Sequence, residues 1–222
     1  MPTKRSPRKG SLQFWPRKRA SKFLPSVNWD AIDSQNTTSS AKNLKGFICY
    51  KVGMASASVK DNTSNSMTKG KGIIIPITIL ECPSMKILSA RFYKNSNVVK
   101  EVLAENLDKE LKSKLKLPKS KGKGQRLDGI NPGEYEDARI IAYSQVKKTG
   151  IKKTPDIVEI GLSGNMDEKM KFIKENIGKE ISVTDVFSKG QLVDVRGLTR
   201  GRGLVGPVKR FGIQLKQHKS EK

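Results

Sequence analysis

The most distinctive part of this sequence is the basic, glycine-rich stretch RGLTRGRGLVGPVKRFGIQLKQHK, residues 196–219. Its five glycines alternate with seven Arg or Lys residues, and it contains no acid. A segment with so few large apolar side chains cannot bury enough surface to offset its ordering entropy, so we expect a polyanionic partner to order it. Glycine lets the backbone approach such a partner closely, and the cations neutralise phosphates and release their counterions.

Positive charge is distributed unevenly along the chain. The 222 residues carry a formal net charge of +23, for which nucleic acid is the default partner. Residues 1–22 hold eight cations and no acid, whereas residues 127–195 hold ten cations and twelve acids. A nearly neutral body with basic arms is more typical of an RNA-penetrating protein than of a uniformly basic membrane-surface protein.

Length and composition allow a real hydrophobic core in one large or two small domains. No apolar run approaches the roughly 18 residues of a membrane-spanning helix, and the N-terminus lacks the apolar core of a secretory signal. We therefore expect an intracellular protein. Cys49 and Cys82 lie in apolar runs without metal-ligand spacing, which favours buried thiols over a redox or metal role.

The N-terminal segment RSPRKGSLQFWPRKRASK, residues 5–22, interleaves cations with Phe14 and Trp15 and is broken by proline and glycine. This composition predicts an extended arm. Its guanidinium groups can contact phosphates. Two interpretations of the aromatic pair stay open: the rings stack on unpaired bases, or they anchor the arm to the protein itself.

Between the basic ends, alternating short runs predict a mainly β body with inserted helices. We divide the chain into an arm and linker at 1–45, a body at 46–195 and a basic extension at 196–222. Turn residues separate β-rich runs at 46–54, 73–81, 86–93, 138–146, 156–162, 180–187 and 191–195. The polar segment after the first run has the composition of an exposed hairpin tip, and Pro76 indicates an edge strand or a bulge.

Two helices are expected within this body. Apolar residues recur every four positions from Val99 to Leu115, which predicts an amphipathic helix near 98–115. A second helix is predicted at 166–177, with Asn165 or Ser163 as its cap and Gly178 at its end. The lysine-rich loop after the first of these helices, LPKSKGKGQR at 117–126, is either a solvated surface or an additional RNA contact.

The sequence offers little for catalysis, and we expect no enzymatic activity. Its only histidine is His218, which excludes a histidine triad or a multi-histidine metal site. Gly201, Gly203 and Gly206 match the spacing of a dinucleotide fingerprint, but Pro207 follows at once and no acid lies about 20 positions on. No cofactor is expected beyond structural Mg²⁺ held by an RNA partner.

Five blocks carry a resemblance to a known family. They occur in order along the chain as GSLQFWPRKRA (10–20), GFICYKVGM (46–54), ECPSMKI (81–87), KTPDIVEIGLSG (153–164) and VDVRGLTRGRGLVGPVKRFG (193–212). Together they resemble ribosomal large-subunit protein three, in its archaeal and eukaryotic form. The last block is the most specific, because its glycines and cations follow directly on a predicted strand.

The resemblance implies a translation-protein-type β-barrel with basic RNA-penetrating extensions. It implies a structural constituent of the large ribosomal subunit that binds large-subunit rRNA, supports subunit assembly and the architecture around the peptidyl transferase centre, and resides on the cytoplasmic ribosome. The alternative is a non-ribosomal RNA-binding or RNA-chaperone protein. Charge and resemblance together predict rRNA contacts from Arg5, Arg8, Lys9, Trp15, Arg17, Lys18, Arg19, Arg196, Arg200, Arg202, Lys209, Arg210, Phe211, Lys216, His218 and Lys219.

One departure from the family pattern concerns the partners. Family members continue past the position of Lys219, return through a loop tip that carries a tryptophan, and add the last barrel strands. Either a second polypeptide supplies those strands, or the sequence is a fragment, or the barrel closes differently. We favour a second polypeptide, since the strand predicted at 191–195 would otherwise leave an open edge. The expected partners are thus large-subunit rRNA, neighbouring ribosomal proteins and this second chain.

Overall fold

The computed structural model describes residues 15–32, 44–117, 127–213 and 215–216. These residues fall into two compact units. We call Asn28–Leu192 the body unit, and we call residues 15–27 together with 193–216 the arm unit. The two units are described separately below.

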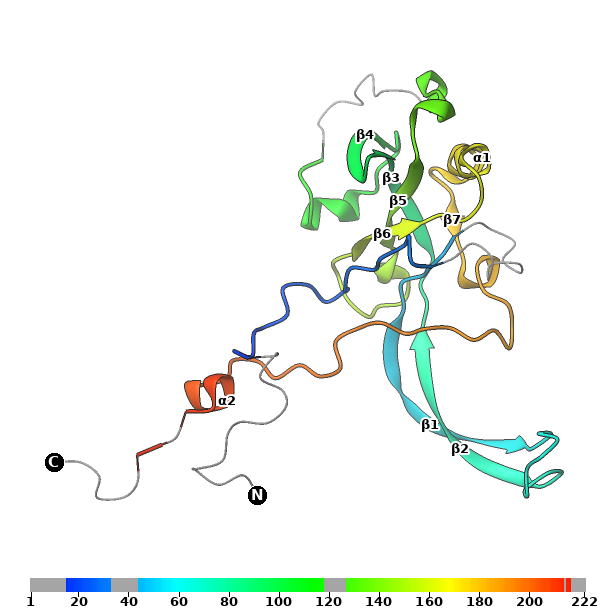
Figure 1. Cartoon of the computed structure of the whole chain (residues 1–222), viewed down its shortest axis with the longest axis vertical. Coiled ribbons are helices and arrows are strands. Elements are labelled where there is room, and N and C mark those ends of the chain that lie inside the picture. Colours follow the sequence, from blue (N-terminus) through cyan, green and yellow to red (C-terminus); the bar gives the residue numbers. More distant parts are fainter. Residues whose placement is uncertain (1–14, 33–43, 118–126, 214, 217–222) are drawn as a thin grey trace. The chain divides into compact units, whose positions relative to one another are not determined.

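An antiparallel five-stranded sheet forms the centre of the body unit (Figure 1). Its order is β4-β3-β5-β6, and the short β7 pairs with one end of β3. The strands are β3 (Met85–Lys94), β4 (Asn97–Leu103), β5 (Asp137–Ser144), β6 (Ile157–Gly161) and β7 (Glu180–Ile181). The β-rich runs predicted at 86–93, 138–146 and 156–162 are thereby confirmed.

The two central strands hold the core. Phe92 of β3 and Ile140 of β5 are completely buried. Tyr143 and Leu88 pack with Leu111 of the 3-10 helix η3 (Lys109–Ser113). Helix α1 packs against β5. Apolar side chains on both faces of β3 and β5 therefore exclude water from the middle of the sheet.

A long hairpin, β1 (Tyr50–Lys60) and β2 (Gly72–Glu81), forms a separate two-stranded sheet. Its ladder runs from Tyr50↔Glu81 to Lys60↔Gly72, with a bulge between Lys51 and Gly53. Directly opposed residues share a face of such a ladder, so one face carries only apolar or small side chains. We call it the apolar hairpin face, and it consists of Gly53, Ala55, Ala57, Val59, Ile73, Ile75, Ile77 and Ile79.

The sequence predictions for this hairpin are confirmed in outline. The first strand begins at Tyr50, later than the predicted run at 46–54, and continues to Lys60. The polar segment between the strands forms the expected tip. Pro76 lies opposite Ser56 in a two-stranded sheet, which is the edge-strand alternative.

The helix predicted near 98–115 is wrong. Residues 97–103 form β4, and a 3-10 helix occupies only Lys109–Ser113. Asn95 and Ser96 take positive φ angles of 51° and 61°, which produces a two-residue hairpin turn and returns the chain onto β3. The β-branched valines that follow this turn fit a pleated strand better than a helix, so the fourfold leucine spacing was misleading.

Helix α1 (Met166–Asn176) forms where the sequence predicts it. The Asn165 backbone N–H donates to Glu168 Oε2 at 3.1 Å, which satisfies one of the free donors at the helix start. Ile173 on its inner face is fully buried. Gly178 follows with a φ of 78°, a conformation that glycine adopts without strain.

The two strands predicted at 180–187 and 191–195 are largely wrong. Only Glu180–Ile181 pairs as β7, and the 3-10 helix η7 (Val183–Asp185) follows at once. Residues 191–195 form no strand among the described residues, and the Leu192 side chain is 98% exposed. A strand needs a neighbour to accept its backbone hydrogen bonds, and the described part of the chain offers none there.

The arm unit contains one short helix, α2 (Pro207–Phe211). Pro207 occupies the first turn, where its missing N–H costs nothing. Gly212 ends the helix with a φ of 62°. The remaining 3-10 helices belong to the body unit: η4 (Leu127–Gly129), η5 (Pro132–Glu134) and η6 (Val146–Lys148). None of the helices described here is both long and apolar enough to cross a membrane.

Candidate nucleic-acid interface

The arm unit joins two basic segments from opposite ends of the sequence. The Arg17 backbone N–H donates to the carbonyl oxygen of Arg210 at 3.2 Å, so the N-terminal arm runs beside α2. Both segments were predicted to bind RNA, but no sequence pattern paired them. The structure therefore assembles one basic surface from residues that reasoning along the chain treated as two.

Trp15 packs against Gly212 inside this unit. A Cβ atom at position 212 would overlap the Trp15 ring, and the positive φ of Gly212 would strain any other residue there. The glycine thus lets the indole lie directly on the end of α2. Of the two interpretations of this aromatic residue, the geometry favours anchoring to the protein itself; Phe14 lies outside the described residues.

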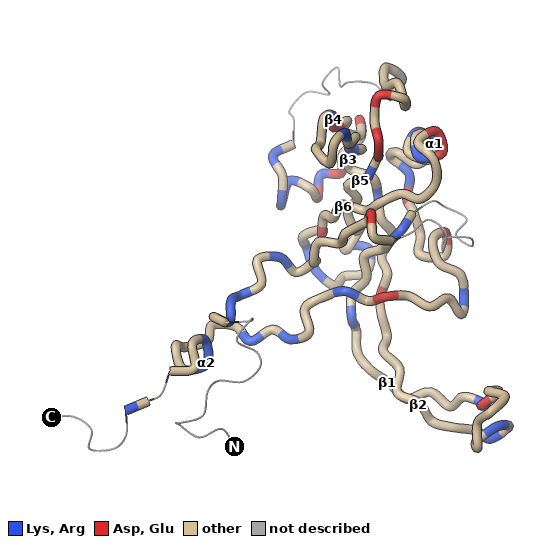
Figure 2. The backbone as a smooth tube through the Cα atoms, viewed as in Figure 1, with Lys and Arg blue, Asp and Glu red and all other residues tan. Residues whose placement is uncertain are grey.

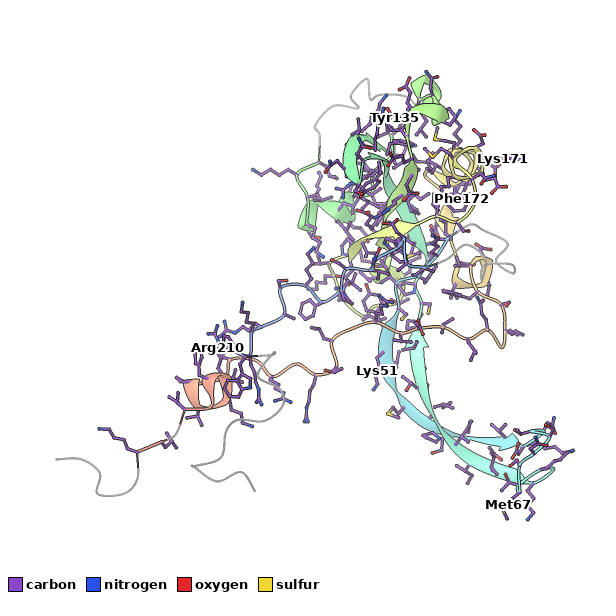
Figure 3. The ribbon with its side chains drawn as sticks, viewed as in Figure 1. Lys51, Met67, Tyr135, Lys171, Phe172 and Arg210 are labelled. Carbon is purple, nitrogen blue, oxygen red and sulfur yellow. The ribbon has the colours of Figure 1, made fainter. Side chains whose placement is uncertain are left out.

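A cationic cleft of about 270 Å³ lies between the paired segments. It is lined by Arg17, Lys18, Arg19, Val205 and Arg210, so four of its five lining residues are cations and none is an acid. Figure 2 shows Lys and Arg along both segments of this unit, and Figure 3 labels Arg210. A phosphate oxygen entering such a cleft would meet several donors at once.

Two aromatic rings hold guanidinium groups within this surface. Arg17 lies over the Trp15 ring at 5.3 Å from its centroid, and Arg210 lies over Phe211 at 5.2 Å. Each stacking contact restricts a long flexible side chain while leaving its N–H groups available. The planar guanidinium groups are thereby partly pre-oriented to donate paired hydrogen bonds to a phosphate.

The other predicted contacts are distributed along the same unit. Exposed side chains belong to Arg196, Arg200, Arg202, Lys209 and Lys216. Asp194 is the only acid among residues 15–27 and 193–216, against ten cations. Most of this charge consequently lacks a carboxylate within its own unit. Arg5, Arg8, Lys9, His218 and Lys219 lie outside the described residues.

The cations of the body unit are arranged differently, because acids neutralise many of them. Arg139 contacts Asp137 at 2.9 Å and Asp30 at 2.8 Å, and Lys169 contacts Asp137 at 2.5 Å. Burial alone would raise the pKa of Asp137, but hydrogen bonds from Lys169 and Arg139 hold that pKa below its usual range. Because these cations are paired with carboxylates, they stabilise the fold and are less available to an anionic partner.

A second network attaches the hairpin to the sheet. The Tyr50 hydroxyl donates to Asp156 Oδ2 at 2.6 Å and lies 2.8 Å from Ser144 Oγ. Lys152 also pairs with Asp156. Burial and the hydrogen bond to Asp156 raise the pKa of Tyr50 well above its ordinary value, so the phenol stays protonated and remains a donor.

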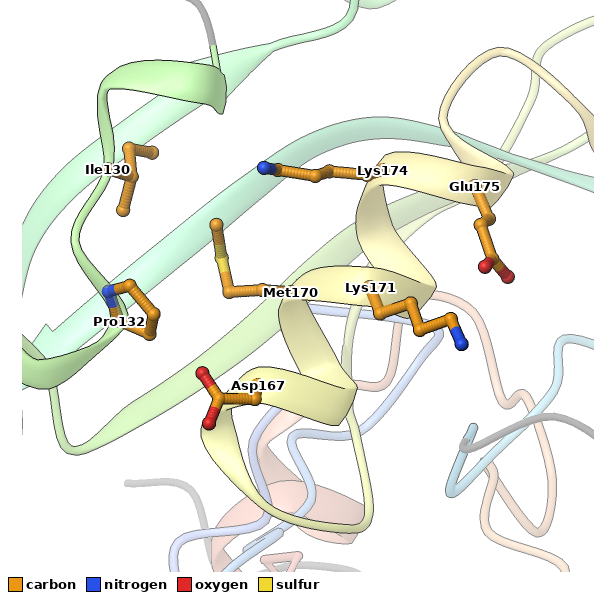
Figure 4. Close-up of a pocket in the computed structure, with 7 residues that line it drawn as sticks. All are labelled: Ile130, Pro132, Asp167, Met170, Lys171, Lys174 and Glu175. Carbon is orange, nitrogen blue, oxygen red and sulfur yellow. The ribbon is translucent and has the colours of Figure 1, made fainter.

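The body unit also contains a cavity and two cysteines. The cavity, of about 410 Å³, lies between η5 and α1 (Figure 4) and is lined by Ile130, Pro132, Asp167, Met170, Lys171, Lys174 and Glu175. Across the described residues, no three His, Cys, Asp or Glu side chains gather as a metal site. Cys49 and Cys82 are half-buried, and burial raises the pKa of both thiols, which disfavours reactive thiolate.

A mainly β body unit together with a second, almost acid-free cationic unit is the composition expected of a polyanion-binding class of protein. Comparison with known proteins makes the assignment specific. The family model described as Ribosomal protein L3 matches residues 1–222, and this chain belongs to that family. The resemblance seen in the five sequence blocks is thereby confirmed.

Relatives from archaea show the same relationship over nearly the whole chain. The large ribosomal subunit protein uL3 of Methanobrevibacter smithii is 38% identical over 223 residues, which cover 96% of this chain and 64% of the relative. The proteins of the same name from Methanocaldococcus jannaschii and Archaeoglobus fulgidus are 37% and 36% identical and are covered to 63% and 62% of their lengths. The chain thus spans somewhat less than two thirds of these relatives.

Proposed function

We propose that this chain is a structural, rRNA-binding constituent of the large ribosomal subunit. The observation that carries the proposal is the arm unit, in which two acid-poor segments from opposite ends of the sequence form one cationic cleft. Family membership supports the same conclusion. In this role the chain supports subunit assembly and the architecture around the peptidyl transferase centre. We expect it to reside on the cytoplasmic ribosome.

The arm unit would bind mainly through phosphates. Arg17 and Arg210 are held by aromatic rings beside the cleft, while Arg200, Arg202 and Lys209 extend the charge along the chain. Binding of this kind releases condensed counterions and depends steeply on salt. The exposed Phe211 ring can in addition pack on a ribose or an unpaired base.

The experiment that tests this function compares two variants with equal charge loss. Replacing Arg200, Arg202, Lys209 and Arg210 with Gln removes four arm cations. Replacing the exposed Lys94, Lys112, Lys171 and Lys179 with Gln removes four body cations. Affinity for a large-subunit rRNA transcript is measured across salt concentrations for both variants and for the unchanged chain.

The arm variant should lose about 0.7 to 0.9 in the slope of log affinity against log salt for each phosphate contact removed, whereas the body variant should keep the original slope. The arm variant should also fail to co-sediment with large subunits at moderate salt. Equal slopes in both variants would contradict the proposal. Binding to RNA in a chain found only outside ribosomes would favour the RNA-chaperone alternative.

We also infer that the apolar hairpin face is covered by further strands, giving a translation-protein-type β-barrel. Ile75, Ile77 and Ile79 on this face are 37%, 36% and 46% exposed. A lone two-stranded ribbon is marginally stable in water, so a face of this composition requires an apolar partner. We propose that a second polypeptide supplies these strands.

A structure of the assembled large subunit tests the barrel. Strands of another polypeptide packed along Ile75 and Ile77 would support both parts of the inference. Strands continuous with this chain would support the barrel and contradict the second polypeptide. RNA or solvent against the face would contradict the barrel itself.

A further inference from the structure

The tip of the β1–β2 hairpin, residues 60–71, has a shape fixed by its own hydrogen bonds. The Asp61 N–H donates to Lys71 O at 3.1 Å, and the Gly70 N–H donates to Asp61 O at 2.7 Å. The Asp61 carboxylate accepts from the Thr63 N–H at 2.9 Å and from the Thr68 hydroxyl at 2.6 Å. The tip is therefore a structured turn rather than a loose connection.

The same bonds remove the only acid of the tip from its outer surface. Asp61 is 8% exposed, and the hydrogen bonds from Thr68 and its neighbours hold the pKa of its carboxyl well below the usual range. Lys60, Lys69 and Lys71 are exposed, and within the described chain none of them forms an ion pair. The tip accordingly presents three exposed cations, while its one carboxylate is buried. Figure 2 shows Lys positions at this end of the hairpin.

Met67 stands at the apex of this cationic turn. Its side chain is 98% exposed, and Figure 3 shows it at the far end of the hairpin. At this exposure the Met67 side chain adds no buried apolar surface to the fold. Methionine is among the apolar side chains that nucleic-acid-binding proteins insert between stacked bases.

The hairpin holds this tip away from the sheet of the body unit (Figure 1). Ten residues of ladder at about 3.3 Å each place the tip roughly 30 Å from the hairpin base. The base is fixed by the bonds from Tyr50 to Asp156 and Ser144. The tip is therefore a projecting part of the body unit, and it shares no residue with the arm unit.

We propose that residues 60–71 form a second RNA-binding site. Lys60, Lys69 and Lys71 contact phosphates of a folded RNA segment, and Met67 packs against a ribose or base between them. RNA fits better than a protein partner because the tip combines uncompensated cations, polar hydroxyls and one apolar apex in a turn without accessible acid. The proposal rests on the proposed function only in taking the partner to be large-subunit rRNA.

The test uses the 222-residue chain with Lys60, Lys69 and Lys71 replaced by Gln. The matched control replaces Lys94, Lys112 and Lys171 with Gln, which removes the same charge from other exposed positions. Affinity for large-subunit rRNA is measured across salt concentrations, and hydroxyl-radical footprints of the bound RNA are recorded. Circular dichroism checks that both variants retain their strands.

The tip variant should lose about 2.1 to 2.7 in the log-log salt slope, at about 0.7 to 0.9 for each of three contacts, while the control keeps its slope. It should also lose one patch of footprint that the arm variant retains. An unchanged slope and footprint would overturn the proposal. Co-sedimentation with large subunits is measured as well. Normal RNA binding with impaired co-sedimentation would also overturn the proposal, since a protein would then be the partner. If the unchanged chain itself fails to bind rRNA, the proposed function fails, and that result is distinct from a failure of the tip alone.

Discussion

The body unit and the arm unit are ordered by different interactions. Phe92 and Ile140 of the body unit are completely buried, and acids neutralise Arg91 and Arg139 within the same unit. The described arm residues include no buried side chain, and one acid faces ten cations there. The body unit thus contains its own stabilising contacts. The arm unit exposes the groups that a polyanion would satisfy.

This difference explains why similar residues have different roles in the two units. Arg139 stacks on Tyr93 at 4.5 Å and pairs with acids, so its charge stabilises the sheet. Arg210 stacks on Phe211 at 5.2 Å beside a cleft lined by other cations. The stacking geometry is alike, but carboxylates pair with Arg139, whereas the lining of the cleft beside Arg210 contains no acid. We therefore expect Arg139 to stabilise the fold and Arg210 to contact a ligand.

The largest expected effect comes from comparing two phenylalanines. Phe92→Ala should lower the free energy of unfolding of the body unit by about 3–5 kcal/mol, because it leaves a cavity in a fully buried site beside Tyr135. Phe211→Ala should change it by less than about 0.5 kcal/mol, because the ring is a surface residue of the arm unit.

Denaturant unfolding and rRNA affinity measured on both variants separate the two roles. Only the Phe211 variant should weaken RNA binding while unfolding normally. If Phe211→Ala destabilised the body unit as much as Phe92→Ala, the division between the units would be wrong.

A smaller effect is expected at the contact between the two arm segments. Gly212→Ala should weaken rRNA binding about fivefold, or ~1 kcal/mol, because a methyl group there collides with Trp15 and the φ of 62° strains alanine. Gly197→Ala is the matched control, since nothing lies near that position and its φ is not positive.

Both glycine variants should unfold like the unchanged chain, because neither position belongs to the body unit. Equal RNA affinities for the two variants would show that pairing of Trp15 with the end of α2 is irrelevant to binding.

The sequence predicted the strands of the body unit best where apolar residues are dense and turns are marked. It predicted α1 because Asn165, Glu168 and Gly178 mark both ends of the helix. It failed at 98–115, where leucines spaced by four outweighed the valines and the Asn95–Ser96 turn in the prediction. The decisive contact there is the pairing of β4 with β3, and a window along the chain contains no information on that partner.

The candidate interface was predicted as a set of residues but not as a surface. Charge segregation alone identified the cations at 196–216 and in the N-terminal arm. Their juxtaposition depends on Trp15 packing on Gly212 and on one backbone bond between Arg17 and Arg210, which are contacts between distant segments. The inward-turned Asp61 of the hairpin tip was missed for a similar reason, since its hydrogen bonds to Thr63 and Thr68 depend on the three-dimensional form of the turn.

Hydrogen exchange on the chain with and without large-subunit rRNA tests the central claim most directly. Amides of β3 and β5 should be protected in the free chain and unchanged by RNA. Amides at 15–27 and 196–213 that donate no backbone hydrogen bond should exchange rapidly in the free chain and slow by at least about tenfold when RNA is bound. Strong protection of the arm unit without RNA, or no change when RNA binds, would contradict the account.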